Sequence, residues 1–247
     1  MRHAIIHYFP LLIVALLWEI TPRLGIVSAN ILPPLSAVAV SWAQLLGEGE
    51  LVSNGLASLI RAGAGLAFAI LFGGTLGILM AWWRPLNAAL GPLVQIFYPI
   101  PKSALIPVTA IWLGFGDASK ILLVFMGCLL PIMLGAFNGA RSTESALVWS
   151  ARSMGASKFG VLRDVVAQSA LPELLNGIRT ALALSFVLLV AGELISASNG
   201  LGYLIGLYGS AGANDAMYAV IVSVAALGFL FDRLFQTFSQ RVLAWQQ

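Results

Sequence analysis

Charged residues are scarce in this sequence. Lys, Arg, Asp and Glu make up 9% of its 247 residues, whereas a soluble domain carries about 25%. Hydrophobic residues make up 60%, and the net charge of +3 is too small for a basic surface that follows a nucleic-acid backbone. This composition excludes a water-soluble globule, a disordered chain and a nucleic-acid partner, and it indicates a protein whose solvent is the lipid bilayer.

The residue types that carry catalysis and metal binding are also scarce. The single cysteine, Cys128, lies in an apolar run, so neither a disulfide nor a cysteine zinc site can form. The two histidines, His3 and His7, have no metal-ligand spacing to carboxylates, and the chain has no G-x-x-x-x-G-K-S/T phosphate-binding loop. We therefore expect a protein that is not an enzyme, with no catalytic residue, metal site or cofactor of its own.

Apolar runs long enough to cross a bilayer, about 20 residues each, recur along the chain. They predict an all-α, polytopic membrane protein with one transmembrane domain over residues 1–247 and six spans, at about 5–25, 62–83, 90–113, 121–140, 176–198 and 216–235. The first run is expected to stay in the protein, because Glu19, Pro22 and Arg23 follow it where a signal peptide would have a small-residue cleavage site.

The distribution of Lys and Arg predicts the orientation, because cytoplasmic loops carry an excess of these residues. If the N-terminus is cytoplasmic, three cations near span ends fall outside, namely Arg23, Arg61 and Lys120. Eight cations then fall inside: Arg2, Arg84, Arg141, Arg152, Lys158, Arg163, Arg233 and Arg241. We therefore expect both termini in the cytoplasm.

Two of the expected connections and one span have local signatures. Residues 26–60 form an outer connection with an interfacial helix from Leu35 to Leu46, and residues 84–89 form a short inner turn. Small residues recur every four positions along the second span, which predicts a face for close helix packing: Gly65, Ala69, Gly73, Gly77 and Ala81.

The third span is interrupted by Pro99, Pro101 and Pro107. Each proline removes a backbone hydrogen bond and kinks a helix, and such breaks persist in lipid only where protein or a water-filled cavity covers them. We therefore expect this span to line a central pathway. Lys102 lies midway along it, and the sequence leaves three possibilities: a contact with the transported molecule, an extension to the inner surface, or a bond to a carbonyl exposed by the kink.

Two further charges lie within or beside the spans, Arg61 and Glu193. Intramembrane charges usually pair, so an ion pair between these two is favoured over a contact with the transported molecule. Arg179, at the inner end of the fifth span, is expected to extend its charge to the membrane surface.

The long inner loop, residues 141–175, has the pattern of two short helices. Ser142 or Thr143 can cap the first helix, with Glu144 in its first turn. Gly155 is expected to end it, and a second short helix begins near Ser157. Two such helices at a cytoplasmic face form a docking surface for a soluble partner.

This loop carries a resemblance to a known family. Residues 149–155, Trp-Ser-Ala-Arg-Ser-Met-Gly, are similar to the E-A-A-x-x-x-G loop motif of permease subunits of type I ABC importers, matching at Ala151 and Gly155 and departing at Trp149 and Ser150. Segments in the same order elsewhere look like the nitrate/sulfonate/taurine branch of these binding-protein-dependent inner membrane components: Leu32-Pro33-Pro34, Ser58 to Arg61, Pro99 to Pro107, Trp112 to Gly116, Ala118 to Lys120, Ala191 to Glu193 and Gly200 to Tyr203.

The resemblance implies a homodimeric permease in the bacterial inner membrane. Its partners would be two ATP-binding cassette subunits, which bind ATP and Mg²⁺, and an extracytoplasmic substrate-binding protein. The residues that contact the ATPase would be Glu144, Trp149, Ser150, Ala151, Arg152, Gly155, Ala156, Ser157 and Lys158. The pathway would carry a small anionic nutrient such as a sulfonate, taurine or nitrate. A heterocyclic nutrient, such as a thiamine-precursor pyrimidine or a riboflavin-like molecule, is the alternative cargo, and an ion-coupled secondary transporter is the alternative class.

Overall fold

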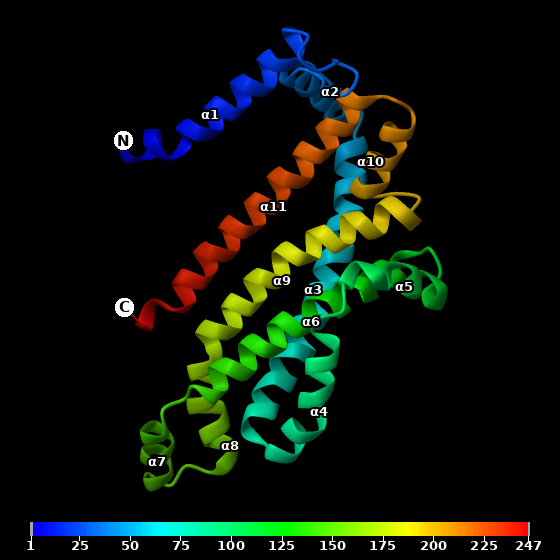
Figure 1. The fold of residues 1–247 in the computed structure, drawn as a ribbon. Coiled ribbons are helices and arrows are strands. Elements are labelled where there is room, and N and C mark those ends of the chain that lie inside the picture. Colours follow the sequence, from blue (N-terminus) through cyan, green and yellow to red (C-terminus); the bar gives the residue numbers. More distant parts are fainter. Residues whose placement is uncertain (1, 247) are drawn as a thin grey trace. The chain divides into compact units, whose positions relative to one another are not determined.

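A computed structural model describes residues 2–246, and within these residues the chain is helical, with no strand (Figure 1). This confirms the all-α prediction. The α-helices are α1 (Arg2–Arg23), α2 (Leu35–Gly47), α3 (Glu50–Trp82), α4 (Arg84–Phe97), α5 (Leu105–Leu113), α6 (Asp117–Arg141), α7 (Ser145–Ser153), α8 (Lys158–Val161), α9 (Ala167–Ser196), α10 (Leu201–Ser210) and α11 (Asn214–Val242). Short 3-10 turns are η1 (Lys102–Ala104) and η3 (Ala244–Gln246), and η2 (Leu162–Val166) is a π-helical turn.

The chain divides into two compact units. The first unit consists of Met1–Ala57 and Glu193–Ala226, and the second consists of Ser58–Gly192 and Leu227–Gln247. The second unit therefore contains α4 to α8 and most of α3 and α9. The first unit contains α1, α2, α10 and the first turns of α3.

Four helical segments are long and apolar enough to cross a membrane: Glu50–Trp82, Asp117–Arg141, Lys158–Ser196 and Asn214–Val242. A fifth candidate is the pair Arg84–Phe97 and Lys102–Leu113, which passes the same test together but is bent by 88°. The predicted span 90–113 therefore corresponds to a bent pair of helices, with the bend in the segment where prolines were expected to interrupt it. The first predicted span coincides with the 22-residue helix α1, and its crossing of the membrane stays a prediction, so four or five of the six spans are supported.

Two predicted boundaries differ from the structure. Helix α3 begins at Glu50, twelve residues before the predicted span, so the outer connection is shorter than expected. The predicted inner turn at 84–89 is helical, because α4 begins at Arg84 and only Trp83 separates it from α3. Pro85 is compatible with this start, since the first turn of a helix has backbone N–H groups without an intrahelical acceptor. The expected helix in the 26–60 connection is present as α2.

Small residues allow the backbones of α3 and α6 to approach closely. A Cβ atom added to Gly65 would lie 2.7 Å from Val124 Cβ, and one added to Gly73 would lie 2.9 Å from the Leu129 carbonyl oxygen. Ala69, between these glycines on the same face, is fully buried. The predicted packing face is thus confirmed, and it lies against α6, next to α3 in Figure 1. Close backbone approach of this kind is how membrane helices associate.

Helices α6 and α9 pack in the same way. A Cβ on Gly139 would lie 2.7 Å from the Ala170 carbonyl oxygen, and one on Gly177 would lie 2.7 Å from the Pro131 carbonyl oxygen. The core of the second unit is built around these contacts, with Val124, Ile132 and Ala181 fully buried. Helices α3, α6 and α9 therefore form one closely packed group.

Candidate coupling and translocation sites

The end of α7 is closed by Gly155. The Ala156 N–H donates to the Ala151 carbonyl over 3.0 Å, and the Gly155 N–H donates to the Arg152 carbonyl over 3.0 Å. Gly155 has φ +86°, a left-handed conformation that glycine adopts without steric cost. These paired bonds are the Schellman arrangement, which satisfies the last carbonyls of a helix. The prediction that Gly155 ends the helix is confirmed.

The predicted cap at the start of α7 is wrong. The hydroxyls of Ser142 and Thr143 donate to the carbonyls of Gly139 and Ala140, each over 2.9 Å, and so close the end of α6 instead. Glu144 occupies the N-cap position of α7, and its side chain forms no cap hydrogen bond. Hydroxyls just after a helix can satisfy carbonyls that lack an intrahelical partner, and here that use competes with capping the next helix.

The second predicted short helix is the beginning of a long one. Ser157 caps it as expected, because its Oγ accepts from the Gly160 N–H over 3.1 Å. The helix then continues through α8, η2 and α9 from Lys158 to Ser196, over 39 residues. The predicted loop 141–175 is therefore helical from Lys158 onward, and the helix that contains most of the predicted fifth span, 176–198, begins directly after Ser157.

We define residues 144–158 as the knob. Its buried residue, Ala151, packs with Ala140 at the end of α6 and with Val161, Val166 and Ala170 at the start of the following helix. Partly buried residues of α3 pack against the same cluster, including Ile78 and Trp82. The knob is thus fixed to α3, α6 and α9, the rigid connection that a coupling element needs.

The outward surface of the knob is apolar at several positions. Trp149 is 68% exposed and Met154 is 79% exposed, and Phe159 directly after the knob is 71% exposed. Large apolar side chains exposed on short helices between the apolar spans are typical of an interaction site. The other predicted coupling residues are exposed as well, apart from Ala151: Glu144, Ser150, Arg152, Gly155, Ala156, Ser157 and Lys158.

The prolines of the predicted third span have different roles. Pro99 and Pro101 lie between α4 and α5, where the helix pair bends by 88°. Pro107 is the third residue of α5, where a backbone N–H would have no intrahelical acceptor, so it does not kink that helix. The expected break is confirmed at Pro99 and Pro101 and is wrong at Pro107.

Lys102 binds the carbonyls at this break. Its Nζ donates to the carbonyl oxygens of Phe97 (2.7 Å), Tyr98 (3.1 Å) and Ile100 (2.9 Å). Of the three possibilities for Lys102, the structure shows the bond to exposed carbonyls. A cation at the end of α4 is also favoured by the helix dipole.

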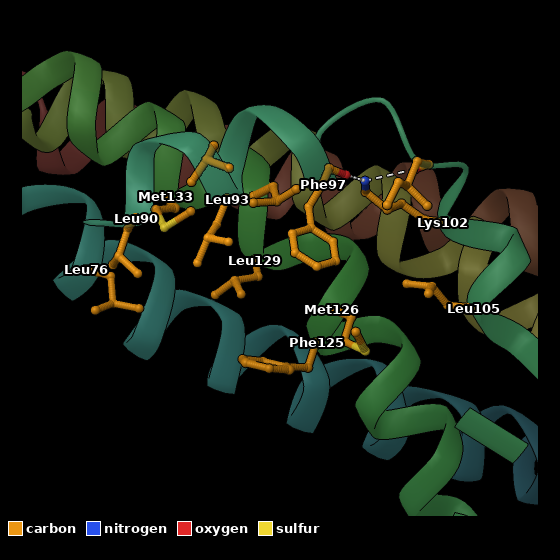
Figure 2. A pocket seen from close by; sticks show the side chains of 13 residues that line it. Leu76, Leu90, Leu93, Phe97, Lys102, Leu105, Phe125, Met126, Leu129 and Met133 are labelled. Atoms are coloured by element: carbon orange, nitrogen blue, oxygen red, sulfur yellow. Dashed lines mark hydrogen bonds between the residues drawn. The ribbon is translucent and has the colours of Figure 1, made fainter. Parts of the chain in front are cut away.

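Lys102 lies at the edge of an apolar cavity of about 350 Å³ in the second unit (Figure 2). The cavity is lined by side chains from α3, α4 and α6, among them Leu76, Leu90, Phe97, Phe125 and Met133. Figure 2 shows Phe97 between the cavity and the Lys102 ammonium. The break thus combines one positive charge with an apolar lining, which suits a small molecule with an anionic group and an alkyl part.

Arg61 has a partner that the sequence analysis missed. Its Nη2 lies 2.6 Å from Asp117 Oδ1, and its Nε donates to the same oxygen over 2.7 Å. The Arg61 side chain is 6% exposed and that of Asp117 is 69% exposed. The sequence does contain a signal for Asp117. This residue directly precedes an apolar run, which is typical of an acidic residue in the first turn of a helix.

Glu193 is fully buried and accepts a hydrogen bond from the Gly202 N–H over 3.0 Å. This N–H belongs to the first turn of α10, where the helix dipole favours a negative charge. The expected ion pair between Arg61 and Glu193 stays a prediction, because these residues belong to different units.

Arg179 has a partner that the sequence did not indicate, and its extension to the membrane surface stays a prediction. Its Nε lies 2.8 Å from Asp232 Oδ1 and its Nη2 lies 3.2 Å from Asp232 Oδ2, a two-point ion pair between α9 and α11. Gln236 donates to Asp232 Oδ2 over 2.6 Å. The Asp232 carboxylate thus receives two charge-assisted hydrogen bonds from Arg179.

Comparisons with known proteins agree with this geometry. Residues 62–244 match the family model described as binding-protein-dependent transport system inner membrane component. The taurine transport system permease protein TauC of Escherichia coli K12 is 33% identical, over 92% of this chain and 85% of TauC. The putative aliphatic sulfonates transport permease protein SsuC of Bacillus subtilis is 30% identical, over 96% of this chain and 86% of SsuC.

A solved structure has the same fold. It is described as inward facing conformations of the MetNI methionine ABC transporter, and it is 24% identical with a TM-score of 0.68. The match covers 78% of this chain and 95% of that chain. The predicted type I permease fold is therefore confirmed.

Proposed function

Because the chain belongs to the family of binding-protein-dependent transport system inner membrane components, we propose that it forms the membrane pathway of an ATP-driven importer of small sulfonates. Membership makes it a multi-pass inner membrane permease of an ABC importer, and in the proposed complex ATP hydrolysis takes place in separate subunits. The knob carries the proposal, because it combines an exposed apolar surface with a buried anchor against three membrane helices.

The proposed assembly has two copies of this chain, two ATPase subunits and one extracytoplasmic binding protein. ATP and Mg²⁺ bind to the ATPase subunits, in keeping with a sequence that has no phosphate-binding loop. The chain itself needs no cofactor or metal. Residues 1–247 act as one transmembrane permease domain with both termini in the cytoplasm, which places the knob on the side of the ATPase.

In the proposed mechanism, the ATPase binds the knob through Trp149, Met154 and the exposed backbone around Gly155. Movement of the ATPase on binding ATP shifts the knob, and Ala151 transmits that shift to α6 and α9 through their common cluster. Closely packed elements move together because protein interiors deform little. The remaining knob residues, Glu144, Ser150, Arg152, Ala156, Ser157 and Lys158, form the polar rim of this contact.

The proposed cargo is a small sulfonate such as taurine or an aliphatic sulfonate. Two relatives that cover most of this chain are named as permeases for taurine and for aliphatic sulfonates. The positive charge of Lys102 beside an apolar cavity suits a molecule with one anionic group and a short alkyl part. We propose that the pathway is lined by the break at Pro99, Pro101 and Lys102, with Pro107, Arg61 and Glu193 supporting it.

The test is uptake by the reconstituted complex in proteoliposomes. We expect uptake of radiolabelled taurine that requires both ATP and the binding protein, and that is competed by ethanesulfonate more strongly than by nitrate. Uptake without ATP, driven by an ion gradient, would contradict the importer. Competition by pyrimidines but not by sulfonates would leave the importer in place and contradict the cargo.

A further inference from the structure

A second cavity, in the first unit, has no role in the mechanism above. Its volume is about 480 Å³, and it is lined by Glu50, Ser53 and Asn54 of α3, by Ser198 and Asn199 of the turn after α9, and by Tyr203, Leu204 and Leu207 of α10. In contrast to the apolar cavity, most of its lining side chains are polar. Its one charged lining residue is the half-buried Glu50.

The carboxylate of Glu50 is held in a fixed position. The Tyr208 hydroxyl donates to Glu50 Oε2 over 2.5 Å. Burial, followed by the bond to Glu50, raises the pKa of Tyr208 to about 12, so this hydroxyl remains a donor at physiological pH. One carboxylate oxygen is thus bound within the protein, and this bond fixes the carboxylate at the edge of the cavity.

The wall of the cavity is rigid. Asn54 Oδ1 accepts from the Gly200 N–H over 2.7 Å, and Asn54 Nδ2 donates to the Glu50 carbonyl over 3.0 Å. Gly200 has φ +113°, and a Cβ atom there would overlap the carboxylate of Glu193. The turn between α9 and α10 is therefore fixed against the first turns of α3, and the cavity is formed before any partner binds.

The charges of the two units have opposite sign. The first unit has five acidic residues, Glu19, Glu48, Glu50, Glu193 and Asp215, and only two cations, Arg2 and Arg23. Arg23 is paired with Glu19 over 2.6 Å. The second unit holds the other eleven Lys and Arg residues of the chain and five acids. Glu193 is fully buried and Glu19 is paired, so the acids that give the surface of the first unit its negative charge are Glu48, Glu50 and Asp215.

We propose that this cavity receives a lysine or arginine side chain of the extracytoplasmic binding protein. The proposal rests on the proposed function, in which the beginning of α3 and the turn between α9 and α10 face outside. The polar lining offers one carboxylate and several hydroxyl and amide groups to such a side chain. An anionic cargo is repelled by Glu50, and one carboxylate is too little for a metal site; the described residues hold no cluster of three or more metal-ligating side chains.

The experiment uses the binding protein that stimulates transport by the wild-type complex. It measures the Kd of this protein for the complex in nanodiscs, which expose both faces of the membrane. We expect Glu50→Gln to raise Kd about tenfold, the effect of losing about 1.4 kcal/mol of charge attraction, and to reduce the dependence of Kd on salt. Glu48→Gln is the matched control, since Glu48 is a nearby exposed acid outside the cavity lining, and it should change Kd by less than twofold. Thermal unfolding of each variant reports folding.

A second variant keeps Glu50 and fills the cavity. Ser53 is exposed and lines the cavity, so Ser53→Arg places a guanidinium beside the Glu50 carboxylate. We expect this variant to weaken binding at least as much as Glu50→Gln does. Wild-type Kd in both cavity variants would overturn the inference, as would equal weakening by Glu48→Gln. A normal Kd with an altered KM for taurine would assign the cavity to the cargo and also overturn it. Absence of binding by the wild-type complex would overturn the proposed function itself, and this inference with it.

Discussion

Gly155 is the residue on which the shape of the knob depends most directly. A Cβ atom at this position meets nothing within 4 Å, so the cost of a substitution comes from the backbone, at about 1–2 kcal/mol for an ordinary residue in the left-handed region. We expect Gly155→Val to reduce ATP-dependent uptake roughly fivefold or more while the amount of protein in the membrane stays normal. The measurement is uptake rate per permease, with the membrane level determined by immunoblotting.

Gly155→Asn is the control for this substitution. Asparagine tolerates the left-handed conformation better than other side chains do, so this variant should retain more activity than Gly155→Val. Normal uptake by the valine variant would refute a coupling role for the helix end. The glycine was predictable from sequence because a helix end is a local property, read from Gly155 itself and the residues before it.

Lys102 should act through the break that it holds together. Hydrogen bonds of a charged donor contribute about 1.5–3 kcal/mol each, and Lys102→Ala removes three of them. We expect this variant to lower the thermal unfolding midpoint and the maximal uptake rate, whereas Lys102→Arg keeps the charge and retains most of both. An alanine variant with normal stability and only a raised KM for taurine would show a contact with cargo instead. The sequence placed Lys102 at the break but could not select its partner, because that depends on which carbonyls the 88° bend exposes.

At the scale of helices, the pair between Arg179 and Asp232 joins α9 to α11. An unpaired charge costs about 2.5–3.5 kcal/mol at the centre of a membrane helix, and less for this pair, because the Arg179 and Asp232 side chains are 51% and 35% exposed. We therefore expect Arg179→Leu and Asp232→Leu each to lower the thermal unfolding midpoint and uptake, and the exchanged double variant, Arg179→Asp with Asp232→Arg, to recover at least half of both. Arg233→Leu, at the neighbouring position, is the control and should have a smaller effect. Failure of the exchange together with full activity of both single variants would show that the pair contributes nothing.

The elements that sequence periodicity predicted well are those set by local pattern. The small-residue face of α3 was predictable because Gly65, Gly73 and Gly77 recur at helical spacing. The join between the knob and the fifth span was missed, because the polar residues Lys158, Arg163 and Asp164 look like a loop in a search for apolar runs. They lie on a helix whose Val161 and Val166 are buried against Ala140 and Ala151, a contact between segments separated in sequence.

For the whole molecule, the untested prediction with the widest consequence is the orientation. The only cysteine, Cys128, is fully buried, so the wild-type protein provides an unreactive background for labelling. We expect a membrane-impermeant maleimide to label Glu48→Cys in intact cells and Met154→Cys only after permeabilisation. The wild-type chain should remain unlabelled in both conditions. The reverse pattern would contradict cytoplasmic termini.

Fold class was predictable from composition and apolar runs, because a bilayer permits few alternatives to helices. The number of spans was less predictable than the fold class. The pair α4 and α5 satisfies the same apolar criterion as a straight span, and only its bend distinguishes it. That bend depends on Pro99, Pro101 and the bonds of Lys102, and a count of apolar residues contains no information about such bonds.

The continuous helix that begins at Lys158 has a consequence for the evolution of chain length. From Ala167 to Gly192, beyond the π-helical turn η2, it extends about 40 Å at 1.5 Å per residue, and each residue turns the chain by 100°. An insertion of one residue within this segment would rotate every later side chain by that angle relative to the knob and would direct buried positions such as Ala181 and Leu189 away from their neighbours. A change in the length of the connection between α1 and α2 would not rotate side chains along a helix in this way. We therefore expect insertions and deletions among descendants of this chain to collect in that connection and to be absent between Ala167 and Gly192.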